Sequence, residues 1–296
     1  MRRAVFLGLF GMLLPGACRR GPLPSDLAGK VVFVSDRDGR EALYVKTLPG
    51  GEERPVMRLD EAPAWPRLSP DGRTVAFSAA GKIGLVSVPL GAPRFVTFGV
   101  EWQDLRPAWR PDGKALAVVA QPSSGRSAEL HLLTLETAPG TARREPILKV
   151  SGLEEVAPAF APDGKTLVYL RDANVFRLDL ASGQSTRLTG GFRSIRAARF
   201  LPSGRLLALW QQGKQCGLDA MDADGNNRET LAQGPAVYQA VAPSPDGHYL
   251  AATLAFEPTV ALRQRSEVRL LDARGRTLGT LSGGRGHDAH SADWGR

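Results

Sequence analysis

The segment Leu68-Ser69-Pro70-Asp71-Gly72 decides the fold of this chain, because closely similar segments recur along it. The further copies are Trp109-Arg110-Pro111-Asp112-Gly113, Phe160-Ala161-Pro162-Asp163-Gly164, Phe200-Leu201-Pro202-Ser203-Gly204 and Pro243-Ser244-Pro245-Asp246-Gly247. The aspartate position, which Ser203 takes in the fourth copy, recurs at residues 71, 112, 163, 203 and 246, so the spacings are 41, 51, 40 and 43 residues. A repeat of this length is typical of one four-stranded blade of a β-propeller.

Each copy has the composition of a tight turn between two strands. Proline presets φ at the first central position, aspartate bonds its own backbone at the second, and glycine accepts a positive φ on leaving the turn. A nearly continuous apolar run follows each turn, as expected of a strand that is covered on both faces. Two further strand-like segments complete each repeat, which predicts four strands per blade.

The two ends of the chain complement each other. Residues 29–34 look like the second strand of a repeat, and residues 289–294 look like a first strand whose turn is missing. Counting both kinds of strand gives six of each, so we predict an all-β, six-bladed β-propeller over residues 29–296. Its last blade is closed by the C-terminal strand pairing with the N-terminal strands, which removes exposed sheet edges.

The repeat resembles a known family. Its pattern is an apolar residue, then Ser-Pro-Asp-Gly, then a basic residue and alternating apolar residues. This pattern is similar to the WD40-like (PD40) repeat of the TolB family, and residues 222–228 resemble that family's turn between outer strands. The resemblance implies a periplasmic propeller that binds partner proteins, including a peptidoglycan-associated lipoprotein. Similar repeats occur in prolyl oligopeptidase-type proteases, but the sequence contains no Gly-x-Ser-x-Gly nucleophile elbow.

The first residues have the composition of an export signal. Met1-Arg2-Arg3 is positively charged, and an apolar stretch from Ala4 to Leu14 follows it. Leu14-Pro15-Gly16-Ala17-Cys18 resembles a bacterial lipobox, so we predict a signal peptide over 1–17, lipidation of Cys18 and a tether over 18–28. The alternative is an ordinary signal peptide cleaved near Ala17. With lipidation, the protein is expected on the periplasmic side of the envelope as an outer-membrane lipoprotein.

Composition narrows the class of partner. The formal net charge of +8 comes from dispersed Lys and Arg, with no basic run interleaved with aromatics, so no nucleic-acid partner is predicted. Acylation of Cys18 would leave Cys216 without a disulfide partner, and Cys216 is predicted to be a buried strand residue. The predicted partner is an envelope protein or a peptidoglycan-associated one. The protein is expected to be a monomer that contacts the membrane only through its anchor.

One face of the propeller is the expected binding face. The loops that enter the innermost strands lie opposite the Pro-Asp-Gly turns, and exposed Trp, Tyr and Arg are common interface anchors. On that face we place Glu61, Trp102, Asp104, Glu155, Arg193, Tyr238 and His290. His287-Asp288-Ala289-His290 carries the histidine pair closest to a metal motif, but no ligand cluster accompanies it, so no metal or cofactor is predicted.

Two functions remain open at this point. The first is a non-enzymatic envelope binding or scaffold protein with no catalytic residues. The alternative is a propeller enzyme, a lyase or hydrolase, with a site at the channel mouth. The alternative gains support if Asp104, Glu155 and His290 converge on one point.

Overall fold

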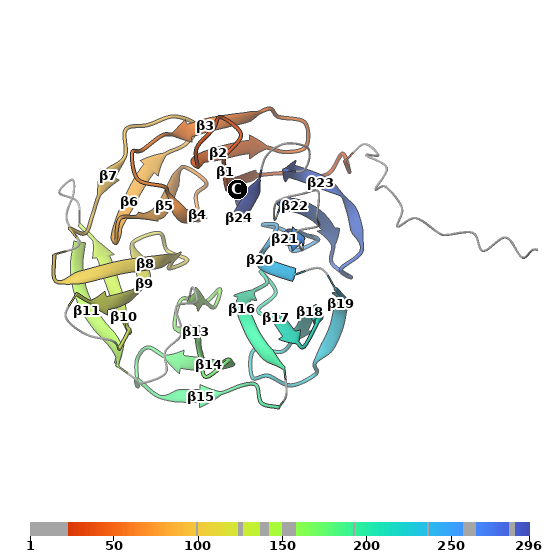
Figure 1. The fold of residues 1–296 in the computed structure, drawn as a ribbon. Helices are drawn as coiled ribbons and strands as arrows, with labels where there is room; N and C mark the ends of the chain where they lie inside the picture. Colours follow the sequence, from red (N-terminus) through yellow and green to blue (C-terminus); the bar gives the residue numbers. More distant parts are fainter. Residues whose placement is uncertain are drawn as a thin grey trace, which may run out of the picture.

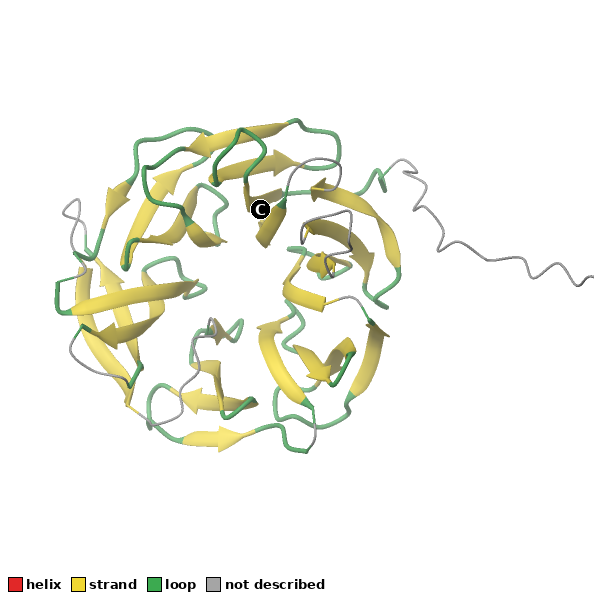
Figure 2. Ribbon diagram, in the orientation of Figure 1, coloured by secondary structure: helices red, strands yellow, loops and turns green. Residues whose placement is uncertain are grey.

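The computed structural model describes residues 23–98, 100–123, 127–136, 142–149, 158–191, 193–235, 237–256, 265–283 and 288–296. These residues form six four-stranded antiparallel sheets around a central axis (Figure 1). They contain strands and turns only (Figure 2), so this part of the chain has no apolar helix of membrane-spanning length. The predicted all-β six-bladed propeller is confirmed.

Each blade contributes one strand to each of four concentric positions. The innermost strands are β4 (Ala64–Leu68), β8 (Trp102–Trp109), β12 (Ala159–Phe160), β16 (Ser194–Phe200), β20 (Val237–Pro243) and β24 (Ala289–Gly295). The second strands are β1 (Lys30–Ser35), β5 (Thr74–Ala79), β9 (Ala115–Pro122), β13 (Thr166–Arg171), β17 (Leu206–Gln212) and β21 (Tyr249–Phe256).

The two outer positions complete the sheets. The third strands are β2 (Ala42–Thr47), β6 (Lys82–Ser87), β10 (Glu129–Leu135), β14 (Asn174–Asp179), β18 (Gln215–Met221) and β22 (Arg265–Asp272). The outermost strands are β3 (Glu53–Met57), β7 (Arg94–Phe95), β11 (Ala142–Lys149), β15 (Ser185–Arg187), β19 (Glu229–Gly234) and β23 (Thr277–Gly283).

The ring closes through one composite sheet of order β24-β1-β2-β3. Strand β24 pairs antiparallel with β1, with Trp294 opposite Val31. The Trp294 ring is 6% exposed, and its Nε1 donates to the Ala28 carbonyl at 3.0 Å. The predicted pairing of the chain ends is therefore confirmed, and it leaves the ring without an open edge.

The hydrophobic core lies between blades. Val75 and Phe77 of β5 are 0% exposed and pack with Val32 and Val45 of the adjacent sheet. A neighbouring blade covers each face, which explains why the second strands carry continuous apolar runs instead of alternating ones.

The recurrent turns behave as their composition predicts. Gly72 has a φ of +68° and Gly164 a φ of +66°, a region that side chains disfavour. In four of the turns an aspartate Oδ1 accepts from the amide two residues later, at 3.1 Å for Asp71, 2.9 Å for Asp112, 2.9 Å for Asp163 and 3.0 Å for Asp246. These bonds hold one end of every such blade in the same conformation.

Candidate functional site

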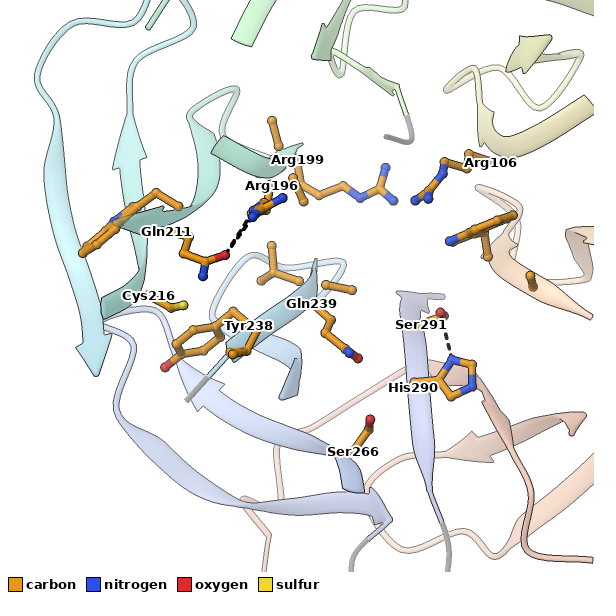
Figure 3. A pocket seen from close by; sticks show the side chains of 18 of the residues that line it. Arg106, Arg196, Arg199, Gln211, Cys216, Tyr238, Gln239, Ser266, His290 and Ser291 are labelled. Atoms are coloured by element: carbon orange, nitrogen blue, oxygen red, sulfur yellow. Dashed lines mark hydrogen bonds between the residues drawn. The ribbon is translucent and has the colours of Figure 1, made fainter. Parts of the chain in front are cut away.

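A cavity of about 750 Å³ opens along the propeller axis, on the face opposite the Pro-Asp-Gly turns (Figure 3). Its lining comes from the innermost strands β4, β8, β16, β20 and β24, together with ends of β17, β18 and β22. We call its opening the wide mouth. Residues from all but one of the six sheets therefore meet at one place, as in the pockets that proteins use for ligands.

β-Bulges turn particular side chains into this cavity. The pairing of each of these five innermost strands with its neighbour shifts register once. At these shifts lie five residues that line the cavity: Trp65, Arg106, Arg196, Gln239 and Ser291. Trp65, Arg106 and Ser291 have φ values of 48°, 54° and 55°, uncommon for residues with a side chain. Bulges re-aim side chains, and here they direct polar groups to the axis.

The wall near β20 is aromatic and partly apolar. Tyr238 is half-buried, and burial raises the pKa of its hydroxyl, so the phenol is neutral at physiological pH. Cys216 of β18 is 3% exposed, as predicted for a buried strand cysteine, and burial raises the pKa of its thiol. This wall can pack against apolar or aromatic groups, while the tyrosine hydroxyl supplies a hydrogen bond.

His290 lies at the rim on β24. Its Nδ1 lies 3.0 Å from Ser291 Oγ (Figure 3). Its Nε2 lies 3.0 Å from Glu41 Oε1. Both ring nitrogens therefore have partners from the protein itself. His290 is a positioned hydrogen-bonding group at the mouth.

A second cavity, of about 390 Å³, opens on the Pro-Asp-Gly face. Arg67 of β4 and Arg199 of β16 line both cavities. They lie where the two cavities meet, a level that we call the waist of the channel. Each of them precedes the aspartate position of its turn by four residues, so they hold equivalent places in two blades.

The waist is positively charged and partly shielded from solvent. Burial lowers the pKa of the Arg67 guanidinium. Burial and the nearby charge of Arg67 lower the pKa of Arg199 to about 9, while the Asp293 carboxylate acts in the opposite direction. Removing water from like charges disfavours their charged forms, which explains the direction of both shifts.

Of the residues predicted for the binding face, the structure brings Tyr238 and His290 together in the wide cavity. Arg193 lies outside its lining. Its Nη1 donates to the fully buried carboxylate of Asp219 at 2.9 Å, and its guanidinium carbon lies 4.0 Å from the centre of the Trp210 ring. Arg193 is thus tied to the interior of its own blade.

Asp104 is placed differently from the sequence-based expectation of an exposed carboxylate. It is 0% exposed, and Arg144 donates to it from Nη1 at 2.9 Å and from Nη2. Trp102 belongs to the same cluster, with its ring 4.5 Å from the His131 ring. A buried charge needs a partner, so Asp104 serves the blade interior and does not join His290 at the mouth.

The remaining predicted residues divide into two groups. Glu61 is exposed on the loop before β4 and is absent from the lining of the cavities described above. Glu155, His287 and the predicted lipidation site Cys18 lie outside the described residues. Within the described ranges, no three His, Cys, Asp or Glu side chains gather in a way that could hold a metal ion.

The channel arginines were not among the residues predicted from the sequence, although the repeat carries a signal for them. Aligned on the turns, the position four residues before the aspartate reads Arg67, Ala108, Ala159, Arg199 and Ala242. Arginine is unusual at this position of the repeat, because the other three copies have alanine there. Nothing in the sequence alone shows that this column faces the axis.

Comparisons with known proteins agree with this geometry. No family model matches the chain. It is 27% identical over 167 residues to a TolB homolog of Chlorobium luteolum, covering 54% of this chain and 36% of that protein. It is 31% identical over 163 residues to the uncharacterized peptidase YuxL of Bacillus subtilis, covering 51% of this chain and 21% of that protein.

A solved structure has the same fold over most of the chain. TolB from Acinetobacter baumannii superposes with a TM-score of 0.74 at 18% identity, covering 92% of this chain and 67% of that one. The chain spans about a third of the length of the TolB homolog that it matches. The protein is therefore a TolB-like six-bladed β-propeller, and its role has to be argued from its own site.

Proposed function

We propose that this protein is a non-enzymatic binding protein of the cell envelope, which holds a partner at the wide mouth of its channel. The observation that carries the proposal is the cavity of about 750 Å³ in which five innermost strands converge. Its lining combines aromatic rings with hydrogen-bonding and cationic side chains, the composition of a recognition site.

The surface around the mouth supports a partner of some size. Phe98 is 67% exposed and Val100 is 79% exposed, and both lie on the connection that leads into β8 on the wide-mouth side. Two exposed apolar side chains on one connection would add apolar contact area to a partner bound at this face. The fitting partner is an envelope protein or a peptidoglycan-associated one.

The resemblance to TolB and the first residues of the chain support the proposed location. TolB homologs favour a periplasmic place, and the signal-like segment 1–17 with Cys18 favours a lipid anchor in the outer membrane. On this proposal the propeller works on a short tether from the membrane surface. Labelling with a fatty-acid analogue, compared between the wild type and Cys18→Ser, tests the anchor.

The site offers little support for the alternative enzyme. Asp104 is held by Arg144 inside its blade, so it does not join His290 at the mouth. The acid that lines the cavity among the described residues, Asp288, accepts from the Ser266 amide at 2.8 Å. Both carboxylates are held by donors of the protein itself, whereas a general acid or base needs free access to its substrate.

Site-specific crosslinking tests the proposal. A photoreactive amino acid at Gln239, an exposed residue of the cavity lining, should capture a specific partner from envelope extracts. The same amino acid at Arg54, on outer strand β3, is the matched control and should capture nothing specific. Tyr238→Ala should reduce the Gln239 product. Equal products at both positions, or none at Gln239, would contradict a partner site at the mouth.

A further inference from the structure

The waist of the channel brings two like charges together in a partly buried place. In the column four residues before each turn aspartate, Arg67 and Arg199 are separated by two alanines, Ala108 and Ala159, and the C-terminal strand β24 adds Asp293. Strands β4 and β16 belong to sheets three places apart in the ring of six, so they face each other across the axis (Figure 1). Two cations thus approach one level of the channel from opposite sides.

Arg67 has unused hydrogen-bonding capacity in a buried place. Its side chain belongs to a residue that is 7% exposed, and its Nη1 donates to the neighbouring Pro66 carbonyl at 2.7 Å. Its Nε is buried and makes no hydrogen bond to the described residues. Buried donors are nearly always satisfied in native proteins, so Arg67 is a side chain whose hydrogen bonds the described residues do not complete.

Arg199 completes a pair of donors. Its Nη1 donates to the Pro158 carbonyl at 3.2 Å, and the neighbouring charge of Arg67 contributes to the low pKa of its guanidinium, after burial. One carboxylate, that of Asp293, lies nearby, and its Oδ2 already accepts from the Leu68 amide at 2.9 Å. Among the described residues of the innermost strands, two cations and one anion therefore lie at this level, and a second anion would relieve the repulsion between the two cations.

The route to the waist is also positive. Arg106 and Arg196 line the wide cavity above it, and Figure 3 shows the Arg106 and Arg199 side chains extending toward each other across the channel. The Arg106 guanidinium lies over the Trp65 ring, 4.1 Å from its centre. Among the described lining residues, the four arginines face a single aspartate, Asp288. A narrow passage lined by one sign of charge concentrates ions of the opposite sign.

We propose that the waist is an oxyanion site, in which Arg67 and Arg199 bind a carboxylate or phosphate group of a ligand that enters through the wide mouth. Arginine fits this role because its planar guanidinium presents parallel N–H donors to a carboxylate or phosphate. The alanines of the same column leave space for the group between the two side chains. The inference deepens the proposed function and depends on it only for the route of entry.

Defined probes test the site in the purified full-length protein. Inorganic phosphate and acetyl-Ala-Ala with a free carboxylate are titrated against the melting temperature, beside acetyl-Ala-Ala amide, which lacks the charge. A ligand that binds only the folded state raises the melting temperature with concentration. Phosphate or the free acid should raise the melting temperature, and the amide should not. Whichever of phosphate and the free acid gives the larger increase is the oxyanion that the site prefers. An amide as effective as the acid would overturn the proposal.

Variants of opposite expected sign separate binding from folding. Arg199→Gln should weaken the affinity about tenfold or more, since a charge-assisted hydrogen bond is lost. Asp293→Asn removes the competing anion and should tighten binding, an effect that damage to the fold does not produce. Arg54→Gln removes the same charge from outer strand β3, where the Arg54 side chain is 69% exposed. This variant should bind the anion as the wild type does.

The unliganded variants supply an independent readout. Arg199→Gln relieves like-charge repulsion at the waist, so its melting temperature without anion should match or exceed that of the wild type. Anion titrations that are unchanged in Arg199→Gln would overturn the site. The crosslinking experiment at Gln239 tests the proposed function independently of the anion site. Anion binding without a crosslinked partner would contradict the proposed function but would still support the oxyanion site at the waist.

Discussion

The repeated turns differ in the side-chain oxygen that accepts a hydrogen bond from the backbone. In four turns a carboxylate oxygen accepts from the amide two residues on, whereas Ser203 Oγ lies 3.5 Å from the Arg205 amide, at the limit of hydrogen bonding. The turn conformation is still kept, with Gly204 at a φ of +86°. Serine therefore preserves the turn through backbone geometry and loses most of the side-chain contribution.

Ser203→Asp should stabilise the protein by about 0.5–1.5 kcal/mol, since it restores a charge-assisted bond to the Arg205 amide. Urea denaturation followed by tryptophan fluorescence measures the change. The reciprocal variant Asp163→Ser removes the bond of Asp163 to the Lys165 amide at 2.9 Å and should destabilise by a similar amount. A destabilising Ser203→Asp would show that the turns are not equivalent.

The residue scale also explains why residues predicted for one binding face lie in different surroundings. Asp104 and Tyr238 both belong to innermost strands, and sequence reasoning treated them alike. The difference is direction: Tyr238 lines the channel, while Asp104 points into its blade toward Arg144. That choice depends on the local register of a bulged strand, which residue types do not reveal.

At the scale of elements, close packing between neighbouring strands restricts composition. Gly84 lies on β6, opposite Phe77 of β5 in the ladder. A Cβ at Gly84 would lie 2.2 Å from the Phe77 ring, which is itself 0% exposed and cannot move outward. The glycine therefore accommodates the ring between blades, and the strand tolerates it because the sheet continues on both sides.

Gly84→Ala should destabilise the protein by about 1–3 kcal/mol, because overpacking forces the buried Phe77 ring to shift. Chemical denaturation of the purified variant measures it. Gly50→Ala is the control, since an added Cβ there meets nothing within 4 Å and should leave stability nearly unchanged. Equal stability of the two variants would contradict the packing argument.

At the scale of the whole molecule, the ring depends on a non-local pairing between its ends. Lys30 Nζ donates to the Gly72 carbonyl at 3.1 Å and to the Arg296 carbonyl at 3.2 Å, which joins the closing strands to the next blade. Trp294 fills the core cluster that contains Val31 and Leu27. Closure thus combines sheet hydrogen bonds with burial of one large aromatic side chain.

Trp294→Ala should lower the stability by about 3–5 kcal/mol, the usual range for a buried aromatic residue replaced by alanine. Denaturation and limited proteolysis should both report it, with cleavage concentrated near the closing blade. Leu278→Ala, at a residue that is 36% exposed on β23, is the control and should have a small effect. A Trp294→Ala protein as stable as the control would mean that closure contributes little.

The sequence by itself determined the blade number, the four-stranded repeat and the closure by the chain ends. These features depend on local turn chemistry and on a period that recurs five times. The tertiary structure alone decided which side chains reach the axis. Bulges in five innermost strands direct particular side chains to the axis. The ring brings Arg67 and Arg199, far apart in the chain, to one level of one channel.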